Sequence, residues 1–200
     1  MFNLSATLNV GRLAYNPSLC LPHLVIPTFE EFPVPLIIRN HHIKAIVFDK
    51  DNCIAKDHDD KLWPQYSTVW DKVKQEYPLE NLLIVSNSAG TNDDLDHSQA
   101  VAVEQDTGVA VLRHSTKKPG CYPEILDHFA RRSILANEIA IVGDRLFTDM
   151  LMANMMGSWG VWIREGVEVS NKMFPRFERD LYERLVAGKS NPFVAPTPKT

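Results

Sequence analysis

Four short apolar runs set the strongest constraint on how this chain can fold. They cover residues 43–48, 82–85, 109–112 and 139–142, and nearly all of their side chains are aliphatic. Strands buried on both faces of a parallel sheet have this composition. The stretches between the runs are long enough for helices, so strands and helices are predicted to alternate. The pattern predicts a single Rossmann-like α/β domain, in which helices cover both faces of a central parallel sheet.

The same pattern predicts the remaining elements and the domain limits. A fifth strand is expected at residues 159–163, and helices are expected at residues 67–77, 94–104, 122–131, 149–156 and 174–185. A chain of 200 residues has room for one full-sized core. We therefore expect an apolar, proline-rich arm at residues 1–40, one α/β domain at residues 41–190, and a flexible tail at residues 191–200.

The arm has two interpretations. Five prolines between Pro17 and Pro35 exclude a long helix or a central strand there. The apolar residues of the arm either pack onto the domain or contact a membrane interface. Its apolar stretches are too short to span a bilayer. The net charge of −4 comes without a long block of one sign, which disfavours a nucleic-acid binder that relies on a broad basic surface.

Two carboxylates follow the first predicted strand. Asp49 and Asp51 stand two residues apart, so in an extended segment their side chains point the same way. Their mutual repulsion calls for a shared proton or a cation, and Mg2+ prefers carboxylate oxygens and water. Such a pair alone is more often a turn or a solvated loop. Its place at the carboxyl end of a parallel strand, where α/β sheets bind ligands, favours a functional site.

The ends of the other predicted strands carry polar groups suited to phosphate. Ser86 and Asn87 follow the second strand and can donate hydrogen bonds to phosphoryl oxygens. Lys118 follows the third strand just before a helix, where it can neutralise a phosphoryl group. Asp144 and Asp149 follow the fourth strand near a helix start. Turns, caps and solvated basic pairs explain each group singly, but four such groups in order are hard to explain that way.

Together these segments support a resemblance to a known family. The series DKDNC, VSNS, KKPG and GDRLFTD resembles the four motifs of the haloacid dehalogenase (HAD) superfamily of phosphatases, over residues 43–163. The nearer match is to the mitochondrial phosphatidylglycerophosphate phosphatase family. The resemblance implies a HAD-type phosphatase domain at residues 41–190. The spacings from Asp49 to Ser86 and from Ser86 to Lys118 leave room for a helix and loops each, so no large cap domain is expected.

The resemblance also implies roles for individual residues. Asp49 would attack phosphorus and form an aspartyl-phosphate, and Asp51 would serve as general acid and then as general base. Mg2+ would be held by Asp49, by the backbone carbonyl of Asp51 and by Asp144. Lys118 is preferred over Lys117 as the catalytic lysine because it directly precedes a proline.

The remaining implied roles concern phosphate binding and support of the site. Ser86 and Asn87 would bind the phosphoryl oxygens together with Lys118. Asp149 would support the metal shell or orient Lys118. Cys53 stands where many relatives have Thr or Val, but no histidine nearby is placed to act as its base, so a nucleophilic role is disfavoured.

The expected function is a Mg2+-dependent phosphatidylglycerophosphatase in cardiolipin biosynthesis. Its partners would be an anionic phospholipid substrate and a membrane surface, with no nucleic acid, and its place would be the matrix side of the mitochondrial inner membrane. An uncapped pocket also suits a phosphate carried by a macromolecule. Two alternatives therefore stay open: a phosphatase acting on a phosphoprotein or a nucleic-acid end, and a non-catalytic phospholipid-binding scaffold.

Overall fold

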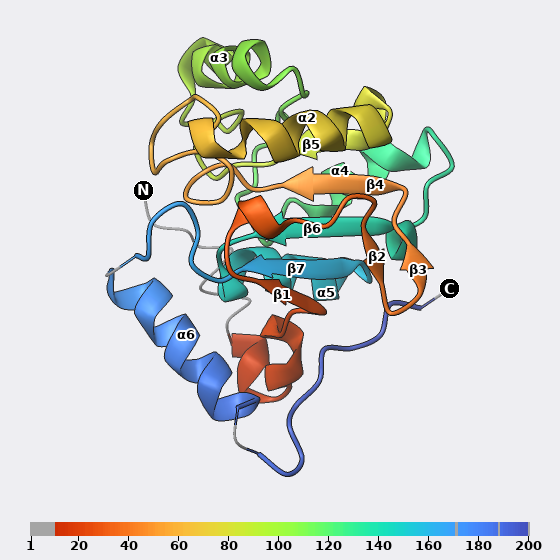
Figure 1. The fold of residues 1–200 in the computed structure, drawn as a ribbon, viewed down its shortest axis with the longest axis vertical. Coiled ribbons are helices and arrows are strands. Elements are labelled where there is room, and N and C mark those ends of the chain that lie inside the picture. Colours follow the sequence, from red (N-terminus) through yellow and green to blue (C-terminus); the bar gives the residue numbers. More distant parts are fainter. Residues whose placement is uncertain (1–10, 171, 188, 200) are drawn as a thin grey trace.

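The computed structural model describes residues 11–170, 172–187 and 189–199. Its main sheet has five strands in the order β1-β7-β6-β4-β5, and all neighbours run parallel (Figure 1). The predicted α/β class with a central parallel sheet is confirmed. The strands are β1 (Leu24–Ile26), β4 (Ala45–Phe48), β5 (Leu82–Ile84), β6 (Ile139–Gly143) and β7 (Trp159–Ile163).

Helices connect and cover these strands. The α-helices are α2 (Ser67–Glu76), α3 (Ser98–Thr107), α4 (Tyr122–Ala130), α5 (Leu151–Met156) and α6 (Met173–Leu185), and a π-helical turn spans Leu146–Met150. Short 3-10 turns lie at Gly11–Ala14, Pro17–Cys20, Phe29–Glu31, Pro64–Tyr66, Leu79–Asn81, Leu95–His97 and Ala136–Glu138. Strands β2 (Ile37–Ile38) and β3 (His41–His42) form a small separate hairpin.

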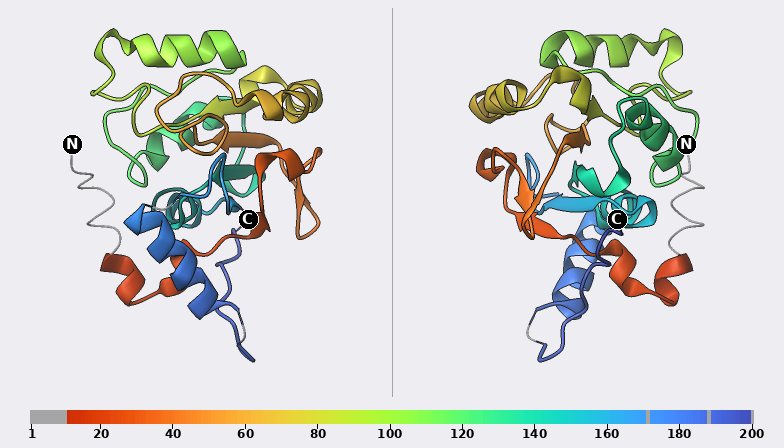
Figure 2. Two further views of the ribbon diagram at one scale, coloured as in Figure 1. Left: turned by 60° about the vertical axis from the view of Figure 1, so that its left-hand side comes forward. Right: turned by 90° about the vertical axis from the view of Figure 1, so that its right-hand side faces the viewer.

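The sheet is buried on both faces because successive side chains of each strand point to opposite sides. In β4, Ile46 and Phe48 pack in a core with residues of α2, α3 and the arm. Ala45 and Val47 pack in a second core with residues of α4 and α5. The two further views in Figure 2 show α2 and α3 at one end of the molecule and α6 at the other. No helix among the described residues is long and apolar enough to cross a membrane.

One predicted strand is wrong. Residues 109–112 make only an isolated parallel bridge, between Val111 and Ile84. Leu112 N donates to Ile84 O at 2.8 Å, while Val111 N donates to a carboxylate oxygen of Glu104 at 2.8 Å. The segment therefore touches β5 at the sheet edge, where a side chain satisfies the outward-facing amide. One helix also begins later than predicted, at Ser98, because the Asp94 carboxylate accepts hydrogen bonds from the amides of the segment around it.

The arm and the chain's end lie against the domain in the structure. Within the arm, Leu24–Ile26 is β1, the edge strand beside β7. Phe29 is fully buried and its ring contacts that of Phe48, with centroids 5.8 Å apart. Near the other end of the chain, the Pro196 carbonyl oxygen lies 2.7 Å from the His23 ring. Buried residues of the arm between Ile26 and Ile38 thus pack in the first core, while Cys20 packs in another cluster with Trp162.

Candidate active site

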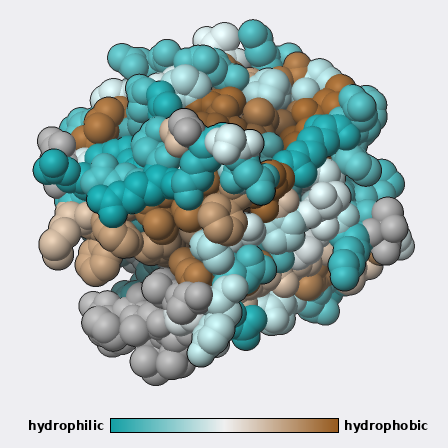
Figure 3. All heavy atoms as spheres, turned by 90° about the horizontal axis from the view of Figure 1, so that it is seen from below, coloured by the Kyte–Doolittle hydropathy of each residue, from teal (hydrophilic) through white to brown (hydrophobic). Residues whose placement is uncertain are grey.

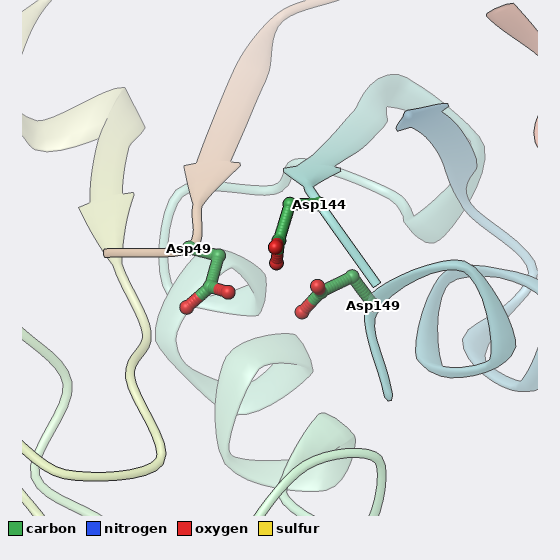
Figure 4. Close-up of side chains that lie close together, drawn as sticks. All are labelled: Asp49, Asp144 and Asp149. Atoms are coloured by element: carbon green, nitrogen blue, oxygen red, sulfur yellow. The ribbon is translucent and has the colours of Figure 1, made fainter. Parts of the chain in front are cut away.

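The site forms where two neighbouring strands end. Asp49 directly follows β4 and Asp144 directly follows β6, and these strands pair along their length. From β4 the chain moves to β5 on one side and later to β6 on the other, and such a reversal opens a crevice at the carboxyl ends. Figure 4 shows Asp49, Asp144 and Asp149 pointing into one space. One carboxylate oxygen of each lies within 4.8 Å of those of the other two.

A buried lysine joins two of these carboxylates. Lys118 is 1% exposed, and its Nζ lies 2.6 Å from Asp49 Oδ1 and 2.7 Å from Asp149 Oδ1. Burial alone would lower the pKa of Lys118, but the carboxylates of Asp149 and Asp49 raise it well above its usual value. Lys118 is therefore charged at neutral pH. Its neighbour Lys117 points elsewhere and pairs with Asp93 at 2.6 Å.

Backbone groups fix the loop that carries Asp149. Its Oδ2 accepts a hydrogen bond from Arg145 N at 3.1 Å, while Oδ1 is held by Lys118. Gly143 makes this possible, because a Cβ atom there would lie 2.4 Å from the carboxyl carbon of Asp149. Asn87 anchors the other side: its Oδ1 accepts a hydrogen bond from Lys118 N at 2.7 Å. Asn87 thus positions the lysine through the main chain.

The carboxylates outnumber the cation that faces them. Burial raises the pKa of Asp49 to about 7; Lys118 opposes this rise, and the charges of Asp149 and Asp51 add to it. Burial, followed by the charges of Asp49 and Asp149, raises the pKa of Asp144 well above its ordinary value. Three hard oxygen donors this close together fit a divalent cation such as Mg2+. The acidic cluster is therefore a suitable metal site.

Asp51 lies in the pocket wall but outside this cluster. Its Oδ2 accepts hydrogen bonds from the hydroxyls of Ser86 at 3.1 Å and Ser88 at 3.0 Å. Its Oδ1 accepts from Lys50 Nζ at 2.7 Å and from His58 N at 2.9 Å. Burial opposes the effect, yet the Lys50 ammonium and these hydrogen bonds hold the pKa of Asp51 below its usual value. The structure therefore turns the Ser86 hydroxyl toward Asp51.

Several residues of the site were missed by sequence reasoning. Lys50 is 1% exposed and supports Asp51, and Asn52 donates from Nδ2 to Asp144 Oδ2 at 3.0 Å. Asn52 adopts a left-handed backbone with φ of 57°, which asparagine tolerates better than most residues. Both lie inside the DKDNC segment, so polar residues between and after the two acids were the available signal. His114 ties two loops together, with ring nitrogens 2.9 Å from Ser86 O and 2.8 Å from Thr116 O.

Cys53 belongs to the core rather than to the pocket. The side chain is fully buried, and burial raises the pKa of its thiol well above the usual value. Its Sγ lies 3.7 Å from Val142 O, on β6. A thiol held protonated in this way is a poor nucleophile.

The pocket in front of the acidic cluster is small. Its volume is about 160 Å³, and one side is formed by the residues that lead into α6. Pockets that enclose a drug-sized ligand usually hold about 300–1,000 Å³, so this one encloses a small group. Its lining consists of Asp49, Asp51, Asn52, Asp57, Asn87, Lys118, Asp144, Arg145, Thr148, Ser170, Lys172 and Pro175.

Known proteins resemble this chain over most of its length. The model of the mitochondrial PGP phosphatase family matches residues 4–168. The mitochondrial phosphatidylglycerophosphatase of Saccharomyces cerevisiae is 58% identical over 92% of this chain and 98% of its own length. A probable mitochondrial phosphatidylglycerophosphatase of Schizosaccharomyces pombe is 33% identical, over 92% of both chains.

A solved structure adds a more distant likeness. A putative HAD-like phosphatase from Mesorhizobium loti has a TM-score of 0.44 and 19% identity, and the match covers 62% of this chain and 73% of that one. The family assignment rests on the family model and on the two yeast relatives. Because that model covers most of the chain and both relatives match nearly end to end, the chain belongs to the mitochondrial PGP phosphatase family.

Proposed function

We propose that this phosphatase removes the terminal phosphate of phosphatidylglycerophosphate, which leaves phosphatidylglycerol for cardiolipin biosynthesis. The names of the two yeast relatives support this substrate. The main structural support for the proposed reaction is the buried contact of Lys118 with Asp49 at the end of β4. A carboxylate oriented by a lysine beside two further acids suits nucleophilic attack on a phosphate monoester.

In the proposed mechanism Asp49 is the nucleophile. The contacts with Lys118 Nζ and Lys50 N both fall on Oδ1, which leaves Oδ2 to attack phosphorus. The new bond from Oδ2 to phosphorus forms as the bond from phosphorus to the glycerol oxygen breaks, and an aspartyl-phosphate results. Lys118 offsets the negative charge on the transferring group. Asn87 lines the pocket, and the Ser86 hydroxyl lies behind Asp51; both complete the proposed phosphate-binding set.

Asp51 is the general acid and then the general base in this mechanism. The leaving glycerol oxygen takes a proton from its carboxyl group, and the resulting carboxylate then takes one from the water that attacks the aspartyl-phosphate. Lys50 and the two serine hydroxyls favour the ionised form before substrate arrives. The negative charge of a bound phosphate raises the pKa of a nearby carboxyl group, which favours the protonated form when the acid is needed.

Mg2+ is the proposed cofactor, with Asp49, Asp144 and the backbone carbonyl of Asp51 as its protein ligands. When bound, it would neutralise charge on the phosphoryl oxygens and orient the group for in-line attack. Asp149 is the proposed supporting residue: its carboxylate oxygens accept hydrogen bonds from Lys118 Nζ and Arg145 N, so it orients the lysine beside the cation. Asp144 accepts a hydrogen bond from Asn52 at one oxygen, so it keeps acceptor capacity for a cation.

The size of the pocket supports a substrate that stays largely outside it. A volume of about 160 Å³ accommodates the phosphate end of a phosphatidylglycerophosphate molecule but not its acyl chains. Those chains would remain in the bilayer while the headgroup reaches the site. The proposed location is the matrix side of the mitochondrial inner membrane, where the protein would bind as a peripheral protein; the mitochondrial relatives support the organelle.

A direct assay tests this function. Phosphate release is measured from phosphatidylglycerophosphate in mixed micelles, with and without Mg2+, beside phosphatidic acid and a soluble aryl phosphate. Asp49→Asn serves as the blank, because it removes the nucleophile with almost no change in volume. We expect Mg2+-dependent turnover that strongly prefers phosphatidylglycerophosphate and is lost in the variant. Turnover of the soluble ester alone, or better turnover of a phosphoprotein or a nucleic-acid end, would refute the substrate; binding without turnover would favour a scaffold.

A further inference from the structure

The first turns of α6 expose large apolar side chains. Met173 is 78% exposed, Phe174 is 64% exposed and Phe177 is 53% exposed. We call these three residues the α6 patch. Figure 3 views the side of the molecule where α6 and the C-terminal segment lie, and hydrophobic residues interrupt its hydrophilic surface. Exposed apolar groups gathered on one helix end point to an interaction site more strongly than the same groups scattered singly.

The α6 patch lies at the mouth of the active-site pocket. Lys172 and Pro175, which flank Met173 and Phe174 in sequence, both line that pocket. The Phe177 ring lies 6.1 Å from that of Phe147, in the loop between Asp144 and Asp149. A surface that covers the α6 patch would therefore also face the pocket mouth.

A buried ion pair fixes α6 to the catalytic loop. Glu178, which is 1% exposed, accepts hydrogen bonds from Arg145 Nε at 2.7 Å and from Phe147 N at 3.0 Å. The side chain faces inward and Arg145 offsets its charge, so Glu178 presents no negative charge to an approaching surface. Losing the Glu178 carboxylate would leave the Phe147 amide and the half-buried Arg145 guanidinium without their acceptor. The position of the α6 patch relative to Asp144 is therefore set by this anchor.

Basic groups border the α6 patch. Arg176 is exposed between Phe174 and Phe177, and Lys172, also exposed, pairs with Asp57 across the pocket mouth. Asp180, one turn beyond Phe177, is exposed and limits how deeply the helix could enter an apolar phase. Aromatic and apolar side chains with flanking cations are typical of helices that lie in the headgroup region of anionic membranes.

We propose that the start of α6 docks on an anionic phospholipid bilayer, with Met173, Phe174 and Phe177 inserted among the headgroups and the pocket mouth held at the membrane surface. This inference rests on the proposed function, because an enzyme with a lipid substrate must approach a bilayer, which the α6 patch would contact. A bilayer fits both the apolar side chains and the neighbouring cations. It would also deliver the phosphate of a lipid to the pocket without extracting the acyl chains.

A fluorescent probe tests the insertion directly. The native cysteines Cys20, Cys53 and Cys121 are all fully buried, so Met173→Cys offers an accessible thiol for an environment-sensitive dye. Leu135→Cys is the matched control, since Leu135 is 61% exposed and precedes the amino end of β6. We expect the dye at position 173, and not the dye at position 135, to brighten and shift to the blue with vesicles of phosphatidylcholine and phosphatidylglycerol. Pure phosphatidylcholine vesicles should give a weaker response.

Vesicle partitioning supplies a second, quantitative measurement. Phe174→Ser combined with Phe177→Ser should lower the partition coefficient on the mixed vesicles at least about tenfold, the effect of roughly 1.4 kcal/mol of lost burial. Leu79→Ser combined with Leu135→Ser removes comparable exposed apolar groups at the amino ends of β5 and β6 and should change it little. Turnover of a soluble aryl phosphate by the Phe174/Phe177 variant should stay near that of the unaltered protein, which also shows that the variant folds.

The outcomes separate this inference from the proposed function. Vesicle binding is measured with the Asp49→Asn variant as well, so it does not depend on turnover or on the true substrate. Equal vesicle binding by the Phe174/Phe177 variant and the unaltered protein, or no response of the dye at position 173, would overturn the docking surface even if phosphatidylglycerophosphate is hydrolysed. A dye response without hydrolysis of that lipid would keep the docking surface and refute the proposed substrate.

Discussion

The crowding of carboxylates at the site makes a prediction about stability. Replacing Asp144 by asparagine removes one negative charge from a cluster in which oxygens lie within 4.8 Å of one another. The hydrogen bond from Asn52 Nδ2 can be kept, because the new amide oxygen is also an acceptor. In a chelating buffer, where no divalent cation offsets the repulsion, we expect Asp144→Asn to be more stable than the unaltered protein.

The size of the effect follows from the distances. Two unit charges 4.8 Å apart repel by about 3.5 kcal/mol at an effective dielectric constant of about 20. Asp144 meets two such neighbours, Asp49 and Asp149, while the hydrogen bond from Asn52 and the charge of Arg145 offset part of the repulsion. A carboxyl group can also avoid the repulsion by staying protonated, which costs about 1.4 kcal/mol of free energy for each pH unit above its ordinary pKa. We therefore expect a gain of about 2–4 kcal/mol near neutral pH, or about 4–16 °C in Tm.

The sign of the pH dependence is also fixed. Burial and the neighbouring charges raise the pKa of Asp144 in the folded protein, so ionisation of this group opposes folding at pH values above its ordinary pKa. The stability gained by Asp144→Asn should be small near about pH 4, where the unfolded chain also holds the proton, and should grow toward neutral pH. Mg2+ should stabilise the unaltered protein at neutral pH and stabilise the variant much less.

Thermal and urea unfolding between acidic and neutral pH, in chelator and in Mg2+, measure these differences. Asp71→Asn is the matched control, because Asp71 has a side chain 63% exposed on α2 and lies outside the acidic cluster. This control should change stability by less than about 0.5 kcal/mol. If Asp144→Asn were no more stable than the unaltered protein at neutral pH in chelator, or if the gap did not vary with pH, the account of the site as a crowded set of carboxylates would fail.

Three further predictions concern the same region. Gly143→Ala should destabilise the fold by more than about 2 kcal/mol in urea unfolding and strongly reduce turnover, because the new Cβ would lie 2.4 Å from the Asp149 carboxyl carbon. A fully active variant would contradict this close approach of residue 143 to Asp149. Glu178→Gln should cost about 1–2 kcal/mol in the same assay, since the half-buried Arg145 loses its charged partner, and an unchanged midpoint would argue against the anchor. Turnover of a soluble ester at low Mg2+ should fall as the pH drops through about 7, because burial raises the pKa of Asp49 to about 7 and the nucleophile must be ionised. A higher Mg2+ concentration should shift this limb of the pH–rate profile to lower pH.

Most of the fold could be predicted because its strands are buried on both faces. The runs that form β4, β5 and β6 are almost continuous aliphatic sequences, which are typical of strands buried on both faces of a parallel sheet. Strand β7 has the sequence WGVWI and is also buried along its whole length. Residues 109–112 are also aliphatic but lie at the sheet edge, where apolar content alone does not separate a strand from a segment that touches one. Strand β1 has only three residues in a proline-rich segment, so no periodic pattern could reveal it.

The site could be predicted only where its residues follow strands. Asp49 and Asp144 come together because parallel strands end at one edge, which the sequence order implies. The four hydrogen bonds that hold Asp51 depend on the path of the loop after β4, and the ion pair between Arg145 and Glu178 joins residues 33 positions apart on separate elements. Such contacts are decided by tertiary packing, so neither spacing nor composition indicates them.

The placement of β1 at the sheet edge has a consequence for the order of folding. Among the described residues, strand β1 pairs only with β7. His23 and Gly160, which form a hydrogen bond beside that pairing, are 137 positions apart. Because β1 is synthesised well before β7, it cannot pair until most of the domain has emerged. Closing so long a loop is slow, and contacts between distant parts of a chain delay folding. We expect native hydrogen-exchange protection to develop early in β4 and β6 and late in β1, so the newly made arm would stay open to proteases or chaperones until β7 is formed.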